Sequence, residues 1–126
     1  MKNFFRTRLA SFRYAFAGWW YVIRTQQNAW IHAVASILVI LVSLWLRISA
    51  VEWALILSAI AAVWSAEFFN TALEAIVDLV TEDHHPLAKV AKDVSAAAVL
   101  IAALMAAGIG FLVLGPPLVE KLKALF

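Results

Sequence analysis

Charged residues divide the chain into long apolar runs. Residues 25–46 and 94–119 contain no Asp, Glu, Lys or Arg. A helix that crosses a bilayer needs roughly 20 apolar residues, and both runs are long enough. A third run starts at Trp53 and meets its first charge at Glu67, but continued through Val77 it also reaches the length of a full span. The pattern therefore predicts three transmembrane helices, one of which carries polar groups.

The polar segments between these runs set the expected helix ends. We expect helices over about 28–46, 51–80 and 87–114. Pro86 fits the first turn of the last helix, where a proline costs no hydrogen bond. The "GPP" at 115–117 is expected to end that helix, because proline cannot donate the backbone bond that a helix needs.

The first 27 residues read as a fourth, different helix. Phe5, Leu9, Phe12 and Phe16 fall at the spacing of one helix face, among arginines. A basic, aromatic amphipathic helix is typical of a segment that lies in the membrane interface. An ordinary leader of the first span is the alternative, and a cleavable signal peptide fits poorly because no clean apolar core precedes a cleavage site.

Composition supports one all-α membrane domain over residues 1–126. The chain is 65% hydrophobic and 14% charged, against about 25% charged residues in an average soluble domain. Its expected parts are an interfacial helix (1–27), three transmembrane helices (28–114) and a short C-terminal tail (115–126). The net charge of +2 is too small and dispersed to indicate nucleic acid, and the absence of cysteine excludes disulfides and thiolate metal sites.

The distribution of Lys and Arg predicts the orientation. With three spans, the N-terminus and the second loop share one side. That side has five basic residues in the leader plus Lys89 and Lys92, whereas the other side has Arg47, Lys121 and Lys123. Since basic residues favour the cytoplasmic side, we expect the leader and the second loop to lie at the cytoplasmic face of the membrane.

Four polar residues lie close together at the cytoplasmic end of the second span. At 100° per residue, Asn70, Glu74 and Asp78 lie about −60°, −20° and +20° around the helix from Glu67. All four share one narrow face, which we call the carboxylate face. A carboxylate in the membrane costs roughly 2.5 to 3.5 kcal/mol on insertion scales, which favours a functional site over a structural polar seam between helices.

A second polar cluster, "HHPLAKVAKD", opens the third span. Lys89, Lys92 and Asp93 lie on one side of that helix at i, i+3 and i+4 spacing, where the lysines could neutralise the carboxylates opposite. The plainer interpretation is a set of charged anchors at the membrane surface. His84 and His85 are weak evidence for a metal site, and a solvated or phosphate-facing role fits them better.

Together the two clusters offer oxygen ligands for a divalent cation, cations for phosphate, and a carboxylate that could deprotonate an alcohol. This inventory fits phosphoryl transfer. The chain has no GxxxxGK[ST] loop, so a nucleotide site would belong to another class. The alternatives are a small ion- or proton-coupled transport subunit, because carboxylates on one face also describe ion paths, and a membrane assembly protein.

The two clusters together resemble the prokaryotic diacylglycerol kinase family, which includes undecaprenol kinases. "EFFNTALEAIVD" is similar to the family's E-x-x-N-[ST]-A-x-E-x-x-V-D, and "HPLAKVAKD" to its H-x-L-x-x-x-A-K-D. The resemblance covers nearly the whole chain. It implies a homotrimer with active sites shared between protomers, and transfer of the γ-phosphoryl group of MgATP to the hydroxyl of a membrane lipid alcohol.

The resemblance also implies roles for individual residues. Glu67 would be the general base, Glu74 a ligand of Mg²⁺ and nucleotide, and Asn70 and Asp78 parts of the surrounding polar site. The nucleotide-contacting positions would be Tyr14, Asp83, His84, His85, Lys92 and Asp93.

One segment departs from the family. Where its members commonly have E-x-N-F-R-I-H, with a second metal-binding glutamate, this chain has "QQNAWIH". Gln26 therefore stands at the metal-binding position and brings an amide oxygen without charge, so we expect weaker Mg²⁺ binding than a glutamate would give. Trp30 stands where the family often has arginine, which bears on contacts with the lipid.

Overall fold

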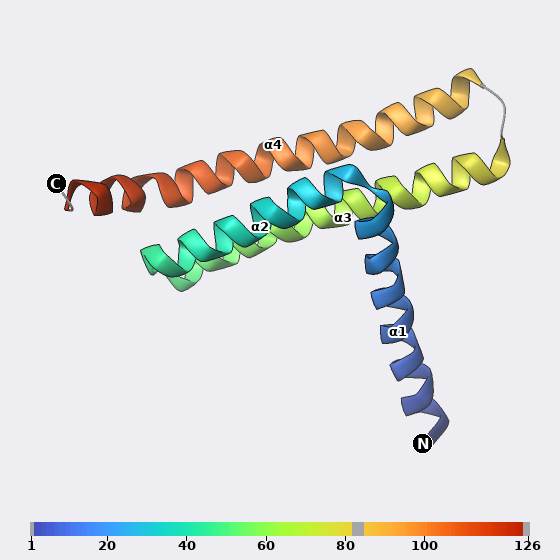
Figure 1. The fold of residues 1–126 in the computed structure, drawn as a ribbon, viewed down its shortest axis with the longest axis horizontal. Coiled ribbons are helices and arrows are strands. Elements are labelled where there is room, and N and C mark those ends of the chain that lie inside the picture. The colour runs from blue at the N-terminus through green and yellow to red at the C-terminus, as the bar shows by residue number, and fades with distance from the viewer. Residues whose placement is uncertain (1, 82–84, 125–126) are drawn as a thin grey trace.

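The described part of the chain, residues 2–81 and 85–124 of a computed structural model, forms four helices and no strand. They are α1 (Lys2–Thr25), α2 (Gln27–Leu46), α3 (Ala50–Val80) and α4 (Pro86–Lys123). Consecutive helices α2, α3 and α4 run antiparallel and side by side, and α4 packs mainly on α3 (Figure 1). The all-α prediction is confirmed.

Helices α2, α3 and α4 are each long and apolar enough to cross a membrane. Their first residues lie within one position of the predicted starts. Many large apolar side chains on α2 and α4 are more than half exposed, including Leu38, Leu41, Leu100, Ile101 and Leu104. Such a surface is stable only against lipid or other protein, so the structure supports the expected membrane protein.

The helix ends follow local sequence signals. After α2, Arg47 adopts a left-handed backbone (φ 56°) that stops the helix. Ser49 and Glu52 then form a reciprocal capping box at the start of α3, in which each side chain accepts a hydrogen bond from the other residue's backbone N–H. His85 caps α4, since its Nδ1 accepts from the N–H of Leu87 at 3.2 Å. These caps satisfy backbone donors that the helices leave unpaired.

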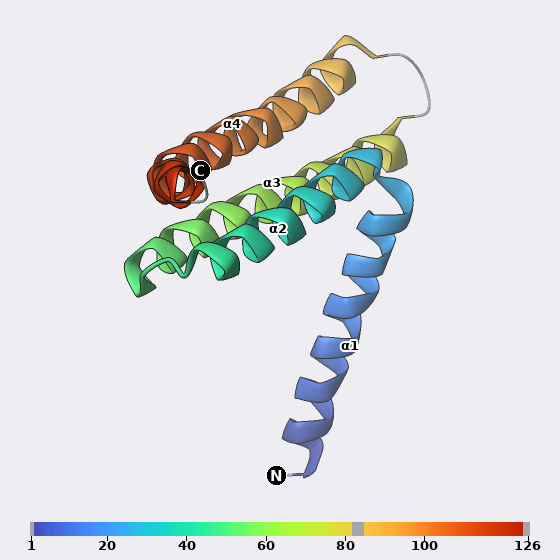
Figure 2. The same ribbon diagram turned by 60° about the vertical axis from the view of Figure 1, so that its left-hand side comes forward.

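Aromatic packing joins α1 to the other helices at one end only. Val22 of α1 and Ala29 of α2 are buried against Trp64 of α3. The Trp19 ring stacks on Trp64 with centroids 4.5 Å apart and meets the Phe68 ring edge-on at 5.1 Å. Beyond this contact α1 projects away from the bundle (Figure 2). The angle of α1 is therefore set by its last two turns.

The projecting part of α1 presents aromatic side chains outward. Phe12 and Phe16 are 65% and 72% exposed, and Tyr14 is 67% exposed. The other two members of the predicted apolar face, Phe5 and Leu9, have side chains outside the described part of the structure. This exposure suits a helix that lies on a membrane surface.

The predicted end of the last span at Leu114 is wrong. Helix α4 continues through Pro116 and Pro117 to Lys123. Each proline removes one backbone hydrogen bond, but contacts with α2 hold the extension in place. Lys121 Nζ donates to the carbonyl of Trp45 at 2.6 Å and lies 4.7 Å from the centre of its ring. Residues 115–123 therefore form the last turns of α4, and they pack on α2.

Candidate active site

The carboxylate face predicted on α3 exists, and its burial decreases along the helix. Glu67 is 1% exposed and Asn70 is 7% exposed. Glu74, one turn later, is half-buried, and Asp78 is exposed. The face therefore leads from a closed interior to the polar end of the bundle, where the α3–α4 connection lies.

Glu74 lies at the centre of a hydrogen-bond network that joins three segments. Gln26, at the α1–α2 junction, donates from Nε2 to Glu74 Oε2 at 3.1 Å, and Asn70 donates from Nδ2 to Oε1 at 3.1 Å. Ser95 of α4 donates its hydroxyl to Asn70 Oδ1 at 2.7 Å and to the backbone carbonyl of Lys92 at 2.9 Å. The metal position predicted at Gln26 and Glu74 is thus one contiguous group of atoms.

The lysines at the start of α4 behave differently from each other. Lys92 Nζ lies 2.6 Å from Asp78 Oδ1 across the α3–α4 interface, as expected for a cation that neutralises the carboxylate face. Lys89 instead pairs with Asp93 on its own helix. His85 lies at the same end of α4, whereas Asp83 and His84 lie outside the described residues.

Tyr14 is the one described site residue that the single chain does not bring near the others. Its ring contacts the Arg13 guanidinium at 5.6 Å on the projecting part of α1. Twelve helical residues, or about 18 Å, separate Tyr14 from Gln26. Figure 2 shows this part of α1 directed away from the polar end of α3.

Residue His32 is a part of the site that sequence reasoning missed. Its Nε2 lies 3.7 Å from Glu67 Oε2, beyond hydrogen-bond distance, and neither atom has a hydrogen-bond partner among the described residues. Two signals were available: His32 is the last residue of the "QQNAWIH" segment, and it is the one ionisable residue in the uncharged run 25–46. Ionisable groups inside spans usually have a function.

Comparison with known proteins decides the family. Residues 13–114 match the sequence model of the family described as prokaryotic diacylglycerol kinase. The chain belongs to the prokaryotic diacylglycerol kinase family. The undecaprenol kinase of Bacillus subtilis (strain 168) is 42% identical over 108 residues, which cover 86% of this chain and 88% of that protein.

Two further kinases of the family are similar over shorter shares of their length. The diacylglycerol kinase of Synechocystis sp. is 44% identical over 113 residues, which are 89% of this chain and 65% of that protein. The diacylglycerol kinase of Escherichia coli (strain K12) is 38% identical over 73 residues, 58% of this chain and 60% of that protein. The protein is therefore a membrane-embedded lipid kinase, and its family favours this activity over the transport subunit considered from sequence.

The kinase offers a suitable but incomplete set of ligands for Mg²⁺. The Glu74 carboxylate and the Gln26 and Asn70 amides supply the hard oxygens that this ion prefers, and a half-turn of either amide exchanges its nitrogen for its oxygen. Among the described residues, no three His, Cys, Asp or Glu side chains gather closely enough to hold a metal ion. The donor set therefore fits an ion that takes its remaining ligands from phosphate and water.

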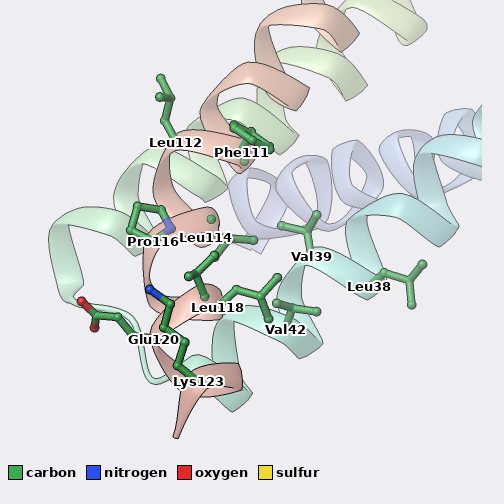
Figure 3. A pocket seen from close by; sticks show the side chains of 13 residues that line it. Leu38, Val39, Val42, Phe111, Leu112, Leu114, Pro116, Leu118, Glu120 and Lys123 are labelled. Atoms are coloured by element: carbon green, nitrogen blue, oxygen red, sulfur yellow. The ribbon is translucent and has the colours of Figure 1, made fainter. Parts of the chain in front are cut away.

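Two apolar pockets lined by described residues lie along the kinase bundle. One, of about 500 Å³, lies between α2, α3 and α4, with His32 and Ser36 among otherwise apolar walls that include Val63, one turn before Glu67. The other, of about 850 Å³, lies at the opposite end, where Val42 of α2 faces Leu118 of α4 (Figure 3). Only the first adjoins the carboxylate face.

Proposed function

We propose that this kinase transfers the γ-phosphoryl group of MgATP to the hydroxyl of a membrane lipid alcohol, diacylglycerol or undecaprenol, at the carboxylate face. The observation that carries the proposal is the position of the buried Glu67. It lies one helical turn from the apolar wall of the first pocket and two turns from Glu74, the centre of the polar network. A lipid alcohol and a water-soluble nucleotide can react only where an apolar region meets a polar one. Phosphoryl transfer depends chiefly on positioning and on charge neutralisation, and both need groups of this kind close together.

Glu67 acts as the general base. As the lipid oxygen forms its bond to the γ-phosphorus, the bond from that phosphorus to the β,γ-bridging oxygen breaks and ADP leaves. The hydroxyl proton passes to the Glu67 carboxylate. Burial of Glu67 at 1% exposure supports this role, because a base shielded from water favours transfer to the lipid over hydrolysis of ATP.

The Glu74 network binds the nucleotide's phosphates. Glu74 and Gln26 hold Mg²⁺, with Asn70 and Asp78 as the surrounding polar groups. When bound, Mg²⁺ neutralises charge that develops on the transferred group. Lys92 contacts phosphate directly, and the contact with Asp78 keeps its ammonium at the polar end of α3.

The nucleotide's remaining contacts come from the second loop, from α4 and from a neighbouring protomer. Asp93 and the loop residues Asp83, His84 and His85 contact the nucleotide. The active protein is a homotrimer whose sites are shared between protomers, and Tyr14 belongs to the site of a neighbour. The outward direction of α1 (Figure 2) supports this arrangement, because Tyr14 is exposed and lies about 18 Å along the helix from Gln26. The site faces the cytoplasm, in agreement with the excess of Lys and Arg on its side.

A transfer assay tests the proposal. Purified protein in lipid is incubated with labelled ATP, Mg²⁺ and a panel containing diacylglycerol, undecaprenol and a single-chain alcohol. We expect label in at least one lipid phosphate, and a loss of roughly 10²- to 10⁴-fold for Glu67→Gln, the usual contribution of a general base. Glu74→Gln should abolish Mg²⁺-dependent transfer.

A matched control is Glu120→Gln, which removes a carboxylate exposed near the other end of the bundle and should keep full activity. Absence of label in every lipid would overturn the substrate class. Full transfer by Glu67→Gln and Glu74→Gln would leave the kinase without the site assigned to it.

A further inference from the structure

Two buried polar atoms of the kinase face each other without hydrogen-bond partners. They are His32 Nε2 on α2 and Glu67 Oε2 on α3, 3.7 Å apart, and no described side chain or backbone group bonds to either. The Glu67 side chain is 1% exposed and that of His32 is 14% exposed. A buried polar group left unpaired costs free energy, so such a pair at a reactive position needs an explanation.

The surroundings hold the two side chains close together. Ser36, one turn after His32 on the same face of α2, accepts a hydrogen bond from Trp64 Nε1 at 3.2 Å. The His32 ring meets the Trp64 ring edge-on, with centroids 6.5 Å apart. Glu67 follows Trp64 by three residues and so lies over the same part of α2. Trp64, held by its hydrogen bond to Ser36, therefore limits the positions that the His32 and Glu67 side chains can take.

The distance is short enough for a small movement to close it. A charge-assisted hydrogen bond from nitrogen to a carboxylate is about 2.7 to 2.9 Å long. The side chains need to approach by about 1 Å, which torsion changes in Glu67 supply without moving either helix. Neutral imidazole with its proton on Nε2 is a suitable donor.

We propose that His32 is a positioning residue for Glu67, donating from Nε2 to Oε2 and thereby directing Oε1 toward the lipid hydroxyl. The inference rests on the proposed role of Glu67 as the base. His32 does not touch the reacting atoms in this arrangement. It holds one carboxylate oxygen so that the other faces the substrate, at a place where both polar atoms are buried.

The experiment compares His32→Leu, which removes the donor, with His32→Gln, whose amide can still donate. Both are measured in the full-length protein in lipid vesicles, with ATP and the lipid alcohol varied separately. Because a hydrogen bond to a charged group contributes strongly, its removal in His32→Leu should lower kcat by roughly 10- to 100-fold. The KM for each substrate should change less than about threefold, and His32→Gln should recover most of the loss, because the role requires a donor and not an imidazole.

A double-mutant cycle separates positioning from a purely structural role. In the Glu67→Gln background, adding His32→Leu should cause no further loss, because the group that His32 positions is already absent. Thermal unfolding of every variant checks that the fold is retained. A structural role would instead lower the unfolding temperature and reduce the residual activity by the same factor in both backgrounds.

The outcomes for the two proposals differ. Full activity of Glu67→Gln would remove the base assignment and the premise of this inference with it. An inactive Glu67→Gln together with a wild-type rate for His32→Leu would overturn the role of His32 alone. Equal losses from His32→Leu in both backgrounds would also overturn it.

Discussion

Replacing Gln26 by glutamate tests whether Gln26 belongs to the proposed Mg²⁺ site. In the structure Gln26 Nε2 donates to Glu74 Oε2 at 3.1 Å. Gln26→Glu replaces that attractive contact by two carboxylates at a similar separation. The metal-free protein should therefore become less stable, and a divalent cation between the two groups should be bound more tightly.

The size of the effect follows from the distance. Two unit charges 3.1 Å apart repel by about 5 kcal/mol at an effective dielectric constant of about 20. Both side chains are only partly buried, so solvent reduces this figure, and the lost hydrogen bond to a charged group is itself worth about 1.5 to 3 kcal/mol. If Mg²⁺ binding removes about 2 kcal/mol of this repulsion, the Mg²⁺ concentration that gives half-maximal activity should be roughly 10- to 30-fold lower.

Two measurements check this value. The first is kinase rate against free Mg²⁺ at fixed ATP, and the second is the rise in unfolding temperature that Mg²⁺ produces without nucleotide. Gln27→Glu is the matched control, because Gln27 is exposed at the same helix start and the substitution adds the same charge. It also shares any favourable interaction with the helix dipole.

Unchanged or higher Mg²⁺ demand in Gln26→Glu would refute the assignment of Gln26 to the metal site. An equal decrease in Gln27→Glu would show that added negative charge at the membrane surface, and not coordination, causes the effect.

Two further substitutions separate function from stability. Lys92→Ala should lower activity by roughly 10²-fold or more, the usual effect of losing a group that stabilises developing charge, while the unfolding temperature hardly changes, because its ion pair with Asp78 is largely exposed. Lys89→Ala removes the same charge one turn earlier and should keep more than half the activity. Asn70→Ala leaves Glu74 without one hydrogen-bond donor. The free energy of unfolding, measured by calorimetry or thermal unfolding, should fall by about 1 to 3 kcal/mol. A stable Asn70→Ala, or an equally inactive Lys89→Ala, would contradict these roles.

The helices and the carboxylate face could be predicted because their signals are local. Uncharged runs long enough to span a bilayer mark α2 and α4, and the 100° period alone places Glu67, Asn70 and Glu74 on one side of α3. Charge spacing placed both Lys89 and Lys92 opposite the carboxylates, whereas in the structure Lys92 pairs with Asp78 of α3 and Lys89 pairs with Asp93 of its own helix. None of these conclusions needs knowledge of which helices are neighbours.

The remaining features depend on contacts between helices. The rule that ended α4 at residue 114 considers only the backbone bonds that Pro116 and Pro117 remove, whereas Lys121 is held by Trp45, 76 positions away. The contact of His32 with Glu67 likewise requires the register of α2 on α3. Sequence patterns carry no information on that register.

The length of α3 sets the depth of each residue of the carboxylate face relative to the lipid. We expect Arg47 and Trp45, next to its first residue, at the outer boundary of the membrane. Its 31 residues measure about 46 Å, against a hydrocarbon layer of about 30 Å. Counted from Ala50, Glu67 lies at about 26 Å, Asn70 at about 30 Å and Glu74 at about 36 Å. With the roles proposed above, Glu67 would lie just inside the hydrocarbon boundary, where a lipid hydroxyl can reach it. Glu74 would lie about 6 Å beyond that boundary, so that ATP need not enter the hydrocarbon layer.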